Sequence, residues 1–155
     1  MKKVKKVSVC GLPGVGKTTL IKLLSEQCVP SEYVPTVGID FGDTKIGEFK
    51  VSLWDLGGQE QFRFMWDSFL PGTDTILLVT DSTRAGVQKT KELVKKYSNF
   101  NGSKLLVIAN KQDLPGALSP NEVESILGAE THGLVAINPE SKNYLFKILQ
   151  KQFSS

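Results

Sequence analysis

The feature that most constrains this 155-residue chain is the run Gly11-Leu12-Pro13-Gly14-Val15-Gly16-Lys17-Thr18. It matches the phosphate-binding pattern G-x-x-x-x-G-K-[ST] in full. A motif of this kind can also be an ordinary glycine-rich turn, so its surroundings decide. Valines at alternating positions precede the run and predict a strand, and leucines at helical spacing follow it and predict a helix. The strand-loop-helix setting predicts a bound phosphate.

Each part of the motif has a role in that chemistry. The backbone N–H groups of Gly14, Val15 and Gly16 are expected to surround the phosphates at the positive end of the following helix. Lys17 is expected to contact the β- and γ-phosphates. Thr18 offers its hydroxyl to Mg²⁺, a cation that prefers oxygen, and Thr19 completes the predicted nucleotide-binding set of this loop.

Length and composition limit the alternatives. A chain of 155 residues suits one domain, here residues 1–155. Lysine and arginine number 19 against 16 acidic residues, without a long basic tract, so nucleic acid is not an expected partner. Cys10 and Cys28 lack metal-ligand spacing, and no apolar run approaches the roughly 20 residues that span a bilayer. We therefore expect a soluble, cytoplasmic monomer.

The middle of the chain supplies candidates for the γ-phosphate. Residues 28–38 predict a surface loop, in which Thr36 can offer its hydroxyl to Mg²⁺. Residues 39–47 and 48–55 predict a β-hairpin that ends at Asp55, a candidate Mg²⁺ ligand through water. The backbone N–H of Gly58 can contact a terminal phosphate. Gln59 can orient an attacking water, because an amide both donates and accepts, and it is the main catalytic candidate together with Lys17 and Thr36.

Two near-continuous apolar runs, residues 75–80 and 104–109, predict parallel strands covered on both faces by helices. The second run leads into Asn110-Lys111-Gln112-Asp113, at the strand end where open α/β sheets bind ligands. Asp113 can accept hydrogen bonds from the ring N–H and the amine of guanine, which selects guanine over adenine. Asn110 is expected to link this loop to the phosphate loop, and the Lys111 stem to cover the base.

The remaining pattern completes an α/β fold. Helices are predicted over about 85–97, from Ser119 or Asn121 to Leu127, and over 141–153. Residues 134–137 predict a short last strand. His132, the sole histidine, falls between the predicted elements without a neighbouring nucleophile and is predicted to lie in a solvated loop.

Taken together, the four motifs resemble those of small Ras-superfamily GTPases, and more closely the ADP-ribosylation-factor (Arf and Arf-like) branch. They are Gly11 to Thr18, Pro35 to Gly38, Trp54 to Gln59 and Asn110 to Pro115, in family order. The resemblance implies a P-loop fold with a mostly parallel six-stranded sheet, one antiparallel edge hairpin strand and helices on both faces. It also implies a contact from the Ala136 backbone N–H to guanine O6.

The resemblance further implies a GDP/GTP switch whose loops, at about residues 30–40 and 56–68, respond to the γ-phosphate. Protein effectors, an exchange factor and a GTPase-activating protein are the implied partners. Trp54, Trp66 and Phe69 match positions around the family's effector surface, although they can equally be core residues.

The chain also departs from the family pattern. Ile39 stands where an aromatic residue is common, and Val135-Ala136-Ile137-Asn138 stands where Ser-Ala or Cys-Ala is usual. Pro13 lies within the phosphate loop. Residue 2 is Lys rather than the Gly of N-myristoylation, and the chain has no room for the usual N-terminal amphipathic helix, so no intrinsic lipid anchor is expected. Membrane contact would need a partner or the weakly basic N-terminus.

The leading prediction is a GTPase that binds GTP or GDP with Mg²⁺ and hydrolyses GTP slowly without an activating protein. The motifs place no arginine at the γ-phosphate, and Arg63 and Arg84 remain alternatives. A constitutively nucleotide-loaded scaffold with negligible hydrolysis would have the same fold. A P-loop ATPase or small-molecule kinase is disfavoured by the guanine-selecting residues around Asp113.

Overall fold

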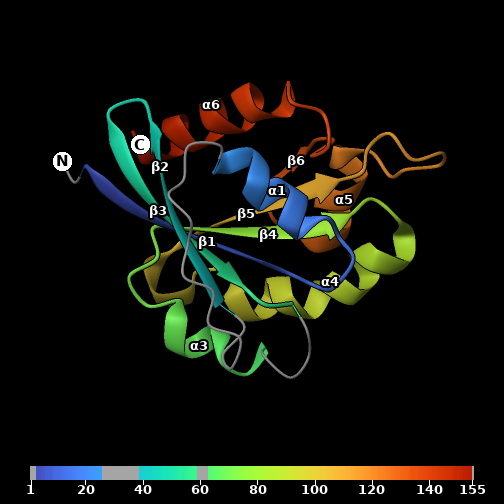
Figure 1. Cartoon of the computed structure of the whole chain (residues 1–155). Helices are drawn as coiled ribbons and strands as arrows, with labels where there is room; N and C mark the ends of the chain where they lie inside the picture. Colours follow the sequence, from blue (N-terminus) through green and yellow to red (C-terminus); the bar gives the residue numbers. More distant parts are fainter. Residues whose placement is uncertain (1–2, 26–38, 59–62, 155) are drawn as a thin grey trace.

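The structure is a computed structural model that describes residues 3–25, 39–58 and 63–154 (Figure 1). In these segments six strands form one sheet, in the order β2-β3-β1-β4-β5-β6. The strands are β1 (Val4–Gly11), β2 (Ile39–Ile46), β3 (Phe49–Leu56), β4 (Thr75–Asp81), β5 (Lys104–Asn110) and β6 (Thr131–Gly133). The helices are α1 (Lys17–Leu24), α3 (Trp66–Phe69), α4 (Arg84–Tyr97), α5 (Pro120–Leu127) and α6 (Ser141–Phe153), with a 3₁₀ turn at Phe100–Gly102. No described helix has the length and apolar character needed to span a membrane.

The sheet is parallel except at one edge. β1 lies between β3 and β4 and pairs in parallel with both, and the β4–β5 and β5–β6 pairs are also parallel. Only β2, at the edge, runs antiparallel to its neighbour β3. This confirms the predicted mostly parallel six-stranded sheet with one antiparallel edge strand.

Helices cover both faces of the sheet. α1 and α6 lie over one face, and α3, α4 and α5 over the other (Figure 1). Successive residues of a strand point to opposite faces, so Val9 packs under α1 and α6 whereas Cys10 packs on the other side. Cys10 is fully buried, and this burial raises the pKa of its thiol to about 12. Cys10 is therefore an unreactive core residue.

Local signals set the helix boundaries. Ser119 begins α5 with a capping box, in which its hydroxyl accepts from the Glu122 N–H and the Glu122 carboxylate accepts from the Ser119 N–H. Ser119, rather than Asn121, is therefore the helix cap. α5 ends at Leu127 and is followed by Gly128, whose φ of 71° is a left-handed conformation that glycine adopts without strain.

The last strand differs from its prediction. The sequence predicts a strand over residues 134–137, whereas β6 spans Thr131–Gly133. Leu134 and Ala136 are buried, but they belong to a loop that turns back toward the end of β5. The short continuous apolar run at residues 134–137 therefore belongs to a partly buried loop rather than to a strand.

Candidate functional site

The phosphate loop leaves the end of β1 and enters α1 beside an open cavity of about 490 Å³. Its lining residues come from this loop, from the loop after β3 and from the loop after β5. They are Leu12, Pro13, Gly14, Gly16, Lys17, Thr18, Thr19, Gly58 and Lys111. The cavity lies at the carboxyl ends of the parallel strands, where ligands bind in open α/β sheets.

Two glycines allow the loops to approach each other. Gly16 has a φ of 91°, and a Cβ atom there would lie 2.2 Å from the side-chain nitrogen of Asn110. A Cβ atom on Gly58 would lie 2.3 Å from the carbonyl oxygen of Gly11. Any side chain at either position would therefore push apart the segments that form the cavity.

Lys17 and Asp55 contact each other directly at the cavity. The Lys17 ammonium donates to the Asp55 carboxylate, and both side chains are largely buried. The β3 strand thus delivers an acidic group to the first turn of α1. If an anionic ligand bound the Lys17 ammonium, the Asp55 carboxylate would require another cation or hydrogen-bond donor.

The loop after β5 is joined to the phosphate loop by Asn110. Its side-chain nitrogen donates to the carbonyl oxygen of Val15 at 3.0 Å, and its side-chain oxygen accepts from the Ala136 N–H at 2.9 Å. The expected link between the two loops is therefore present. Because the Ala136 N–H is engaged with Asn110, its contact with guanine O6 stays a prediction.

Lys111 and Asp113 follow Asn110 on the open side of the site. Lys111 has a φ of 64°, and its ammonium donates to the carbonyl oxygen of Gly14 at 2.8 Å, so its stem crosses above the phosphate loop. Asp113 is exposed to solvent. An exposed carboxylate beside a fixed lysine stem is available to a ligand, as the guanine hypothesis requires.

The oxygen atoms that the described residues offer are suitable ligands for Mg²⁺. Thr18 presents a hydroxyl at the cavity, and Asp55 presents a carboxylate beside it through its contact with Lys17. Mg²⁺ takes few protein oxygens and keeps several waters and substrate phosphates, which matches this sparse set. Two other predicted residues, Thr36 and Gln59, lie outside the described residues. Arg84 begins α4 and is not among the residues that line the cavity.

Aromatic side chains from β2, β3 and α3 form a cluster that includes Trp54, the residue before Asp55. Trp54 lies edge-to-face with Phe41 at 4.6 Å between ring centroids and is 6.1 Å from Phe69. All three are half-buried, whereas Trp66 is a core residue that donates to the carbonyl oxygen of Gly57. The sequence analysis did not predict that Phe41 belongs to this cluster. Its position two residues after Ile39 was a signal for it, because residues i and i+2 of a strand lie on the same face.

Lys6 is a second residue that the sequence reasoning missed. Its ammonium donates to the carbonyl oxygens of Phe69 and Pro71 and lies 3.8 Å from the centroid of the Trp54 ring. Burial lowers the pKa of Lys6. One lysine of β1 therefore fixes the aromatic cluster against the chain that follows α3.

His132 corrects the prediction of a solvated loop. It lies within β6, with its Nε2 atom 2.8 Å from a Glu130 carboxylate oxygen and its Nδ1 atom 3.4 Å from the Tyr144 hydroxyl. The prediction was wrong because β6 was placed three residues too late in the sequence.

Comparison with known proteins agrees with this site. The family model of the ADP-ribosylation factor family matches residues 1–149. ADP-ribosylation factor-like protein 5 of Dictyostelium discoideum is 40% identical over 127 residues, which are 79% of this chain and 68% of that protein. ADP-ribosylation factor-like protein 2 of Drosophila melanogaster is 34% identical over 139 residues, 84% of this chain and 75% of that protein. The chain therefore belongs to the ADP-ribosylation factor family, a family of small GTP-binding regulatory GTPases.

Proposed function

We propose that this protein is a molecular switch that binds GTP with Mg²⁺, hydrolyses it to GDP and phosphate, and reports its nucleotide state to protein effectors. The proposal rests mainly on the hydrogen bond from the Asn110 side chain to the carbonyl oxygen of Val15. This bond joins the loop with the guanine-selecting residues to the phosphate loop. One bound nucleotide can then contact both loops, with its phosphates over residues 11–18 and its base near Asp113. This arrangement supports a guanine nucleotide rather than a simple phosphate as ligand.

Different residues of the chain bind the phosphates and Mg²⁺. The N–H groups of the loop and of the first turn of α1 bind phosphate oxygens, and Lys17 contacts the β- and γ-phosphates after it leaves Asp55. Thr18, Thr36 and, through water, Asp55 would hold Mg²⁺, which neutralises charge on the phosphates when bound. The Gly58 N–H contacts the γ-phosphate, because the packing against Gly11 brings the backbone of this loop to the cavity.

Gln59 orients the attacking water and is the residue on which hydrolysis depends. Thr36 helps by contacting the γ-phosphate through its backbone N–H. Intrinsic hydrolysis is slow in this proposal, and the position of Arg84 outside the lining of the cavity supports it. An activating protein that supplies an arginine would accelerate hydrolysis by about 10³–10⁵-fold.

The γ-phosphate orders the loops at about residues 30–40 and 56–68, and its loss releases them. Trp54 and Phe69 flank the second loop in the sequence, and their cluster with Phe41 supports this region as the effector surface. An exchange factor replaces GDP with GTP. We propose that the protein acts in the cytoplasm as a monomer, with no nucleic-acid partner.

Single-turnover hydrolysis tests the proposal. GTP-loaded wild type is expected to convert its nucleotide to GDP slowly, whereas Gln59→Leu binds GTP normally but hydrolyses it at least about tenfold more slowly. Gln88→Leu changes an exposed glutamine on α4 in the same way and serves as the matched control. Equal rates for wild type and Gln59→Leu would remove Gln59 from the mechanism. A wild type that never hydrolyses would favour the nucleotide-loaded scaffold.

A further inference from the structure

A hydrogen bond connects the core beneath α3 with the loop that leads from β3 to the phosphate cavity. Trp66, the first residue of α3, is almost fully buried, and its indole Nε1–H donates to the carbonyl oxygen of Gly57 at 2.9 Å. Gly58, the next residue, lines the phosphate cavity. A buried indole N–H usually finds an acceptor, and this acceptor belongs to the same peptide unit as the Gly58 N–H. One core side chain therefore reaches the edge of the nucleotide site.

The geometry of the peptide bond links this contact to the direction of the Gly58 N–H. The peptide unit between Gly57 and Gly58 is planar and trans, so its C=O and N–H groups point in opposite directions. Trp66 packs in the core cluster on the face of the sheet that α3, α4 and α5 cover, whereas α1 covers the other face. The Gly58 backbone also packs against Gly11 of the phosphate loop. Because Trp66 holds the carbonyl toward its own cluster, the Gly58 N–H is directed away from it, toward the side of the phosphate loop and α1.

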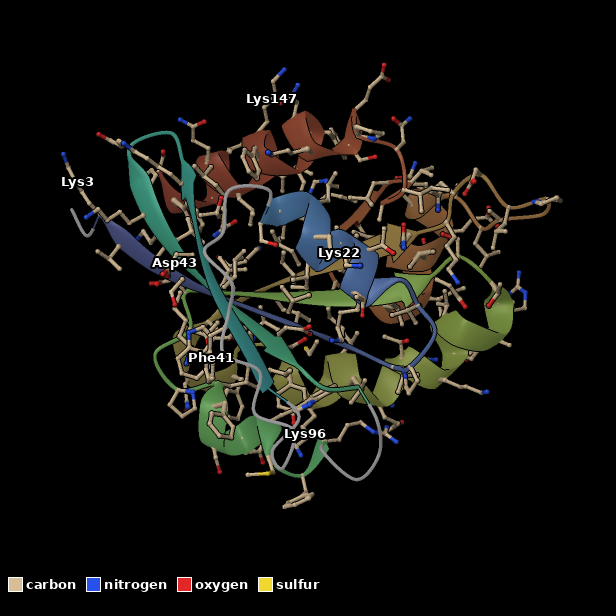
Figure 2. All side chains as sticks on the ribbon, viewed as in Figure 1. Lys3, Lys22, Phe41, Asp43, Lys96 and Lys147 are labelled. Atoms are coloured by element: carbon tan, nitrogen blue, oxygen red, sulfur yellow. The ribbon has the colours of Figure 1, made fainter. Side chains whose placement is uncertain are left out.

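The indole is held in a fixed position by α4. Its ring packs on that of Tyr97 with 5.8 Å between the ring centroids, and the Tyr97 hydroxyl donates to the Asp67 carboxylate at 2.9 Å. Lys96 lies on the same side of the sheet as α3 (Figure 2), and its ammonium is 3.5 Å from the other oxygen of that carboxylate. These contacts hold α3 on α4. A group that is fixed before the ligand binds needs no reorganisation when it binds.

We propose that Trp66 is a positioning residue for the γ-phosphate: its indole N–H holds the Gly57–Gly58 peptide in the orientation that directs the Gly58 N–H at this phosphate. The inference rests on the proposed function, to which the contact between Gly58 and the γ-phosphate belongs. GDP has no γ-phosphate. Loss of the indole N–H therefore weakens the binding of GTP and leaves the binding of GDP unchanged. A bond that only stabilised the fold would not distinguish the two nucleotides.

The test removes the indole N–H and keeps the shape of the ring. In the variant Trp66→benzothienylalanine a sulfur atom replaces the N–H group, so the side chain fills the same space but cannot donate. Affinities for GDP and for the non-hydrolysable β,γ-imido analogue of GTP are measured by competition titration in the presence of Mg²⁺. The affinity for the GTP analogue is expected to fall by about tenfold, and that for GDP to stay within about twofold of wild type.

A matched control removes a buried hydrogen bond of the same kind at the other end of the sheet. The Ser103 hydroxyl donates to the carbonyl oxygen of Thr73 at 2.6 Å, and these buried residues precede β5 and β4, at the edge opposite to the nucleotide site. Ser103→Ala is expected to lower the thermal midpoint and to leave both affinities unchanged. Trp66→Phe, which also lacks the N–H, is expected to lower the thermal midpoint and to show the same selective loss for the GTP analogue.

The possible results separate this inference from the proposed function. The inference is overturned if Trp66→benzothienylalanine binds both nucleotides as wild type does, or if it loses affinity for GDP and the GTP analogue by the same factor. In either case the wild-type protein still binds guanine nucleotides, and the proposed function stands. A wild-type protein that binds neither GDP nor the GTP analogue would overturn the proposed function, and with it the positioning role of Trp66.

Discussion

The side-chain amide of Asn110 donates to the carbonyl oxygen of Val15 at 3.0 Å, across 95 positions of sequence. The same amide accepts the Ala136 N–H, so three loops meet at one buried side chain. The β5–β6 pairing also holds the loop after β6 beside the loop after β5, and Lys111 adds a second link to the phosphate loop through the carbonyl oxygen of Gly14. Asn110 is therefore the side chain that contacts all three loops at once, and we expect the geometry of the nucleotide site to depend strongly on it.

Replacing Asn110 tests that dependence. Asn110→Ala leaves the Ala136 N–H without its acceptor, and an unpaired buried polar group costs about 1–3 kcal/mol. We expect the free energy of unfolding in urea to fall by that amount and GDP to dissociate faster. Asn143→Ala changes an exposed asparagine of α6 and should have little effect. Indistinguishable unfolding and GDP release for the two variants would contradict the account.

Asp113 should control base choice rather than stability. Asp113→Asn removes an anionic acceptor for guanine, and hydrogen bonds to charged groups are worth about 1.5–3 kcal/mol, so GDP affinity should fall by roughly tenfold or more. The new amide donor suits the C2 oxygen of xanthine, so xanthosine diphosphate should gain affinity. Since Asp113 is exposed, unfolding without nucleotide should be unchanged. Unaltered GDP affinity in competition titrations would count against the assigned role.

The contact between α3 and α4 gives a stability prediction. The Tyr97 hydroxyl donates to the Asp67 carboxylate at 2.9 Å, and burial together with this contact raises the pKa of Tyr97 above its usual range. Tyr97→Phe is expected to cost about 1 kcal/mol in urea unfolding, because the hydrogen bond is lost while the ring stays packed on Trp66. Tyr144→Phe removes only a 3.4 Å contact and should cost less. A larger loss for Tyr144→Phe would contradict this ranking.

Glu130 gives a prediction for pH. The hydrogen bond from His132 lowers the pKa of the Glu130 carboxyl below its usual 4.5. A carboxyl whose pKa is lower in the folded state stabilises the fold above about pH 4.5, and this contribution is lost as pH falls through the lowered value. Glu130→Gln should therefore reduce the thermal midpoint at about pH 5.5 but much less at about pH 3.

Glu92→Gln is the matched control for that comparison, because its carboxylate is 84% exposed on α4. Its effect on the thermal midpoint should be small at both pH values. A midpoint difference between wild type and Glu130→Gln that stays the same from about pH 5.5 to about pH 3 would show that the His132 contact does not favour the ionised carboxyl.

The sequence predicted the parts of the structure that local chemistry determines. The phosphate loop follows from its glycines, the buried strands β4 and β5 from their continuous apolar runs, and the start of α5 from the Ser119 capping signal. These features depend on residues close together in the chain. Their periods and turn chemistry therefore carry enough information to place them.

The predictions from the sequence were wrong or incomplete where contacts between residues distant in the chain determine the structure. β6 has only three residues, and the loop after it buries Leu134 and Ala136 through a contact with Asn110, so an apolar pattern there did not mark a strand. The environment of His132 depends in part on Tyr144, which reaches it only when α6 packs beside β6. The role of Lys6 likewise depends on carbonyl groups more than sixty positions away.

The most direct test of the central claim is to identify the nucleotide that copurifies with the protein. The purified chain is denatured, and the released nucleotide is separated by chromatography against GDP, GTP, ADP and ATP standards. A guanine-nucleotide switch that hydrolyses GTP should release mainly GDP, in close to equimolar amount. An adenine nucleotide in its place would contradict the assignment of Asp113 and with it the proposed function.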